Sequence, residues 1–93
     1  MPRMEAFSLA EARAAGRSPH SASAEELFHL GLIHSLGIDG PPDLIAAQTW
    51  LNLAAMKGSA QARICRRELA AEMSPEQMAE AQRQASLWIA PHP

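Results

Sequence analysis

The sequence of 93 residues contains neither valine nor tyrosine, and Thr49 is its only threonine. β-Branched and aromatic residues are the ones that β-strands favour, so their scarcity argues against a sheet. The residues in excess are strong helix formers, with nineteen alanines and ten leucines. A chain of 93 residues allows one small domain, since about 100 to 200 residues per domain is usual. We therefore expect a single all-α domain.

Cysteine, excess charge and long apolar runs are also scarce. Cys65 is the only cysteine, so no internal disulfide can form, and a reducing cytoplasm is the simplest compartment. No stretch approaches the roughly 18 uncharged apolar residues of a membrane-spanning helix, and Glu5 and Glu11 interrupt any apolar run that a secretory signal would need. The net charge of −2 gives no general affinity for nucleic-acid backbones. We expect a cytoplasmic protein without a membrane partner.

Start and stop signals in the first half predict two helices and a linker. Residues 4–15 form a short helix that Gly16 ends, and the polar stretch 17–23 contains a proline and is typical of a linker. Ser23 can cap a second helix that runs to about residue 36. The stretch 37–42 has two glycines and two prolines, which predict a turn.

Three further helices are predicted in the second half. Asp43 is the N-cap of a helix that ends before Gly58, where a left-handed backbone is expected. Ser59 caps the next helix, which runs to about residue 72. In the last helix, which Pro91 closes, Ser74 and Gln77 have the spacing of a capping box. The sequence thus predicts about five helices, four of which form two hairpins.

An internal repeat links the two predicted hairpins. Ser23-Ala24-Glu25 and Ser59-Ala60-Gln61 both open helices and lie 36 residues apart. A period of this length is typical of helix-turn-helix repeats, in which each unit buries its apolar face against the next. The first unit also has small residues where antiparallel helices approach each other, among large apolar residues that fill the space around them. The residues of this pattern are Ala24, Phe28-His29-Leu30-Gly31, Gly37, Asp43, Ala46-Ala47, Trp50-Leu51, Ala54-Ala55, Gly58, Ala60 and Ala62.

This combined spacing resembles the Sel-one-like repeats (SLR), which are relatives of the tetratricopeptide repeats. The resemblance covers residues 23–62 well and continues more loosely to about residue 89. It implies an α-α superhelix, here a short solenoid of helical hairpins, and an adaptor or scaffold role in protein complexes. Residues 1–22 would be an N-terminal helix and linker, and residues 23–93 the repeat domain, with a first unit at 23–58 and a divergent capping unit at 59–90. The divergence shows at Arg66 and Arg67, which stand where the first unit has Leu30 and Gly31.

The same resemblance places a partner helix or peptide in a groove between the hairpins. The first helix of each pair would line this groove, with Leu30, His34, Arg63, Arg66 and Arg67 as the binding residues. The three arginines share one helical face. This face is either solvated and paired with nearby Glu68 and Glu72, or it contacts an acidic protein partner, or it binds nucleic acid. We expect a non-catalytic protein interaction module, with a small nucleic-acid-binding regulator as the alternative.

Few residues are candidates for metal binding or catalysis. His29 and His34 lie five residues apart, about 140° around a helix, so they do not form the ligand pair that a spacing of four would give. His20 falls in the linker and His92 in the tail. Cys65 is expected to be a small core residue, although Arg66 would lower the pKa of an exposed thiol. The sequence predicts no enzyme, no metal site and no cofactor.

Two features bear on association. Trp50 is expected in the core, whereas Trp88 and its neighbours Leu87 and Ile89 would form an association surface if exposed. Helical repeats need about three units to be stable alone, and this chain has room for two. We expect the helix at 4–15 to cap the first hairpin, with homodimerisation as the alternative.

Overall fold

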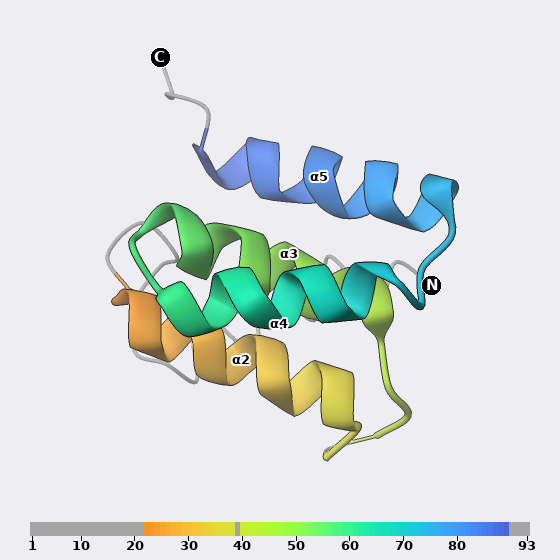
Figure 1. The fold of residues 1–93 in the computed structure, drawn as a ribbon, viewed down its shortest axis with the longest axis horizontal. Coiled ribbons are helices and arrows are strands. Elements are labelled where there is room, and N and C mark those ends of the chain that lie inside the picture. Colours follow the sequence, from red (N-terminus) through yellow and green to blue (C-terminus); the bar gives the residue numbers. More distant parts are fainter. Residues whose placement is uncertain (1–21, 39, 90–93) are drawn as a thin grey trace.

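The computed structural model describes residues 22–38 and 40–89, and within these ranges the chain forms four α-helices and no strand (Figure 1). Their bounds are Ala24–Leu36 (α2), Leu44–Met56 (α3), Ala60–Ala70 (α4) and Pro75–Ile89 (α5). The predicted all-α class is confirmed, and each helix lies close to its predicted range. The helix predicted at 4–15 lies outside the described residues. The predicted total of about five helices is therefore not tested.

Reciprocal side-chain bonds begin α2 and α5. The hydroxyl of Ser74 accepts the backbone N–H of Gln77 at 3.1 Å, and the Gln77 side chain accepts the N–H of Ser74 at 2.9 Å, which confirms the predicted capping box. Ser23 and Glu26 make the same pair of bonds at 3.1 and 2.8 Å. Each box satisfies two amides that have no partner within the first turn of a helix.

Single caps and two left-handed glycines set the other boundaries. Asp43 and Ser59 each accept an N–H from the first turn, of α3 and α4 respectively, at 3.0 Å. Gly37 follows α2 with φ 70°, and Gly58 follows α3 with φ 107°. A side chain is strained at such angles, so these two turns need glycine. The left-handed backbone expected at Gly58 is confirmed.

The helix α3 lies at the centre of the molecule, with α2 on one side and α5 on the other (Figure 1). Nine of its thirteen residues are buried, in the stretches 46–51 and 53–55. A helix that is buried on nearly all sides has neighbours around it. The remaining helices accordingly pack against α3.

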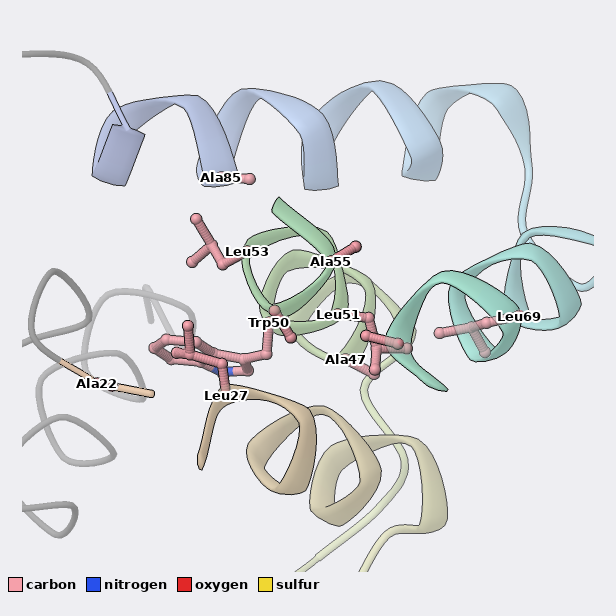
Figure 2. Close-up of a cluster of buried hydrophobic side chains, with 11 residues drawn as sticks. Ala22, Leu27, Ala47, Trp50, Leu51, Leu53, Ala55, Leu69 and Ala85 are labelled. Atoms are coloured by element: carbon pink, nitrogen blue, oxygen red, sulfur yellow. The ribbon is translucent and has the colours of Figure 1, made fainter. Parts of the chain in front are cut away.

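Large side chains from α2 and α3 form the core (Figure 2). Leu27 is fully buried, and Trp50 and Leu51 are each 1% exposed. The predicted core position of Trp50 is confirmed. The side-chain amine of Lys57 donates to the carbonyl of Ala22 at 2.8 Å and so holds the entry of α2 against the end of α3.

The two helix pairs differ in how closely they pack. In the first pair α2 lies along α3, and a Cβ added to Gly31 would stand 2.7 Å from Cδ2 of Leu51. In the second pair α4 and α5 both rest on α3 but make few contacts with each other. The predicted packing of a helix pair is therefore confirmed for α2 and α3, whereas α4 and α5 do not pack closely on each other, and the solenoid stays a prediction.

Candidate functional site

A groove of about 420 Å³ lies where α4 and α5 fail to close on each other. Its lining comes from three helices: α3 provides the floor, and α4 and α5 provide the walls. This volume lies within the range of about 300 to 1,000 Å³ that is typical of ligand sites. Three arginines in its lining make this groove the candidate site.

The floor consists of two amide side chains and one methionine on a helix that is otherwise largely apolar. Gln48, Asn52 and Met56 line the groove and are spaced by four residues, which places them on one face of α3. Gln48 is 1% exposed, whereas Met56 at the other end is 62% exposed. The floor thus rises from a buried end to an open one.

The wall from α4 is basic. Arg63, Arg66, Arg67 and Ala70 line it, so the three arginines that share a face in the sequence lie together on the groove. Arg66 is half-buried, and its guanidinium donates to Oδ1 of Asn52 at 3.4 Å. Arg63 and Arg67 are exposed.

The wall from α5 is uncharged. It consists of Met78, Gln82, Ala85 and Ser86, whose spacing puts them on one face of the helix. The Ser86 hydroxyl donates to the carbonyl of Gln82 at 2.9 Å. Across the groove the arginines therefore face amide, hydroxyl, methyl and thioether groups.

Gln48 joins all three helices of the groove. Its side-chain amide donates to the carbonyl of Arg66 at 3.0 Å and approaches Sδ of Met78 at 3.6 Å. Its buried Oε1 has no hydrogen-bond partner among the described residues. A buried acceptor without a partner lowers the stability of the fold by about 1 to 3 kcal/mol. Gln48 is not among the predicted site residues, although a glutamine within a largely apolar helix is a signal for a buried polar contact.

The pairing of the arginines with Glu68 and Glu72, which the sequence offers as one alternative, is not seen. No ion pair within the described residues joins Arg63, Arg66 or Arg67 to Glu68 or Glu72, and neither glutamate lines the groove. An ion pair between two described residues joins Arg83 and Glu80, on α5. The basic wall therefore has no internal counter-charge of this kind.

Leu30 and His34 lie apart from the arginines. Both are on α2, on the side of α3 away from α5, and neither lines the groove (Figure 1). Leu30 packs partly buried against the core, and the backbone carbonyl of His34 accepts the N–H of Asp43 at 3.0 Å. This groove therefore lies between α4 and α5, whereas the predicted groove lies between the two hairpins, and a binding role for Leu30 and His34 stays a prediction.

The residues that face the partner helix explain why α4 and α5 do not pack closely on each other. Gly31 and Leu30 let α2 pack closely, but Arg66 and Arg67 stand at the matching positions of α4. Closing α5 over guanidinium groups would remove them from water without counter-charges, which is costly. The second hairpin therefore stays open.

Metal-binding and nucleophilic groups do not gather at the groove. The described residues contain no group of three or more His, Cys, Asp or Glu side chains placed to hold a metal ion. His29 is exposed on α2, while His20 and His92 lie outside the described residues. No histidine is among the residues that line the groove.

Cys65 is half-buried on α4. Burial raises the pKa of its thiol, and the nearby carboxylate of Glu68 raises it further. This direction is opposite to the lowering that Arg66 would give to an exposed thiol. Cys65 is therefore a poor nucleophile at neutral pH, and it packs against the core as the sequence predicts.

The end of α5 is only partly an exposed apolar surface. Trp88 packs against the core, whereas Leu87 is 56% exposed. Leu87 does not line the groove. Of the association surface expected from Leu87, Trp88 and Ile89, the structure thus describes one exposed leucine beside a tryptophan that packs against the core.

Among the described residues, none of the helices has the length and apolar character that crossing a membrane requires. Comparisons with protein-family models, curated proteins and solved structures find no match for this chain. The resemblance to the Sel-one-like repeats stays a prediction.

Proposed function

We propose that this chain is a non-catalytic protein interaction module, an adaptor or regulator, that binds another protein in the groove between α4 and α5. The observation that carries the proposal is the groove itself, an open site in a fold whose other helix pair is closed. A cytoplasmic setting fits the single cysteine, whose raised pKa and partial burial suit a reduced thiol.

The lining supports recognition better than catalysis. It offers guanidinium, amide, thioether and methyl groups, and its one hydroxyl, that of Ser86, donates to a backbone carbonyl. No lining residue is a His, Asp, Glu, Cys or Lys that could act as a general base beside this hydroxyl. Arginine and methionine are, in contrast, enriched at protein interfaces.

Blocking the groove tests this proposal. Ser86→Trp places a large side chain on the α5 wall at an exposed position, so the fold should persist while the groove is filled. In affinity capture from the native lysate, we expect proteins that the wild-type chain retains to be lost with this variant.

The matched control is Leu87→Trp. This residue is the next one on α5, is exposed and does not line the groove, so the variant should retain the same proteins as the wild type. Equal capture by the Ser86→Trp and Leu87→Trp variants, both with intact helical circular dichroism, would refute the groove as the binding site.

Nucleic acid is the second candidate, because three arginines on one helix face are a cationic site. Salt-sensitive retention of the intact chain on a DNA or RNA column would favour it. The net charge of −2 and the methionines among the lining favour a protein partner instead. We therefore expect no retention on either column even at low salt.

A further inference from the structure

The charge of the groove restricts its occupant. Three of the eight lysine and arginine residues of the chain line this one groove, and no lining residue is acidic. The chain as a whole carries a net charge of −2. A positive groove on a slightly acidic protein attracts carboxylates in preference to other surfaces of the same molecule.

The spacing of the basic residues suits a helix. Arg63 and Arg67 are exposed and four residues apart, so they stand about one turn, roughly 6 Å, from each other on α4. Carboxylates three or four residues apart on a second helix have the same separation. Two such pairs can form at once when the helices lie side by side.

The floor and the far wall supply the apolar half of the contact. Met56, Met78 and Ala85 line the groove together with the arginines. Methionine side chains adapt to partners of different shape, and small alanines let another helix approach closely. The floor from Gln48 to Met56 is roughly 12 Å long, which is about two turns of helix.

Given the proposed function, on which this step rests, we propose that the occupant is an acidic amphipathic helix of a partner protein. Its carboxylates, three or four residues apart, face Arg63 and Arg67, and its small or apolar residues face Met56, Met78 and Ala85. It packs between α4 and α5 on the floor that α3 provides, and so closes the open hairpin.

Designed peptides test this inference with the full chain. The first is a helical peptide of about 16 residues, roughly 24 Å long, with glutamate at every fourth position on one face and leucine and alanine beside it. The second has glutamine in place of each glutamate. Fluorescence anisotropy should show the first peptide bound at least about tenfold more tightly, since hydrogen bonds between charged groups exceed neutral ones by about this much.

A charge swap makes the test specific. The double variant Arg63→Glu/Arg67→Glu should no longer bind the glutamate peptide. It should instead bind a third peptide, in which lysine replaces each glutamate, more tightly than the wild-type chain does. Arg83→Glu is the matched control, because Arg83 lies on α5 outside the groove, and it should keep the glutamate peptide. Circular dichroism checks that each variant keeps its helices.

Three results would overturn the inference. They are equal binding of the glutamate and glutamine peptides, failure of the charge swap in folded variants, and tighter binding of a single-stranded RNA oligonucleotide than of the glutamate peptide. If Ser86→Trp still abolishes capture from the lysate in any of these cases, the groove remains the binding site and only the acidic helix is wrong.

Discussion

Gly31 shows how one residue sets the distance between two helices. A Cβ at this position would lie 2.7 Å from Cδ2 and 2.8 Å from Cγ of Leu51, and 3.3 Å from the carbonyl of Ala47. Leu51 is 1% exposed, so it has little room to move aside. The close packing of α2 on α3 depends on the missing side chain.

Gly31→Ala should therefore destabilise the fold by about 1 to 3 kcal/mol, as overpacking of a close contact does. Urea unfolding followed by circular dichroism measures the loss. Gly40→Ala is the control, because nothing lies within 4 Å of a Cβ built there, and it should leave the midpoint nearly unchanged. An equal midpoint for the Gly31→Ala variant would contradict the close approach.

The carboxyl group of Glu80 has a strongly lowered pKa. Hydrogen bonds from Arg83 and Gln84 lower its pKa from 4.5 to about 2. Because the pKa is lower in the folded state, the stabilisation is present at neutral pH and is lost as the pH falls from about 4.5 to about 2. The Arg83 and Glu80 side chains are 59% and 37% exposed, so solvent screens the pair and the effect on unfolding is small.

An NMR titration of the Glu80 side chain should give a midpoint near pH 2, and Arg83→Met should raise it, because the hydrogen bonds from the guanidinium, which lower the pKa most, are then removed. A midpoint near 4.5 in the unmodified chain would show that Arg83 and Gln84 do not hold the carboxylate in solution.

Among the elements, α5 illustrates what local sequence decides. Ser74 and Gln77 begin this helix with reciprocal bonds, and these depend only on residues three positions apart. The caps at Asp43 and Ser59 are equally local. For this reason the bounds of the four described helices could be predicted from the sequence.

Ser74→Ala should cost about 1 kcal/mol, because the N–H of Gln77 then loses its acceptor. Thermal unfolding measures the change. Ser86→Ala on the same helix is the control, since its hydroxyl bonds to a carbonyl that already belongs to the helix, and its effect should stay within about 0.5 kcal/mol. Equal losses in the two variants would argue against the cap.

The position of the groove could be predicted only in part. The three arginines share a face because of their spacing, and the structure places all of them on the groove. Leu30 and His34 were grouped with them through the repeat pattern, but α2 packs on another side of α3. Which helix faces which neighbour depends on contacts far apart in the sequence, such as the one from Gln48 to Arg66. Helical periodicity carries no information about such contacts.

Within residues 22–38 and 40–89, α3 takes part in every close helix pair. This helix is buried on nearly all sides. The helices α4 and α5 both pack against it but make few contacts with each other. The resulting groove has a basic wall, an uncharged wall and a floor that joins them through Gln48. A single central helix thus accounts for both the stability of the fold and the site on its surface.

The most direct test of the groove is a map of backbone amide shifts in the isotope-labelled full chain on addition of the glutamate peptide. We expect shifts confined to the segments that line the groove, on α3 from Gln48 to Met56, on α4 from Arg63 to Ala70 and on α5 from Met78 to Ser86, with α2 unchanged. Shifts centred on Leu30 and His34 of α2, with the groove residues unchanged, would contradict it.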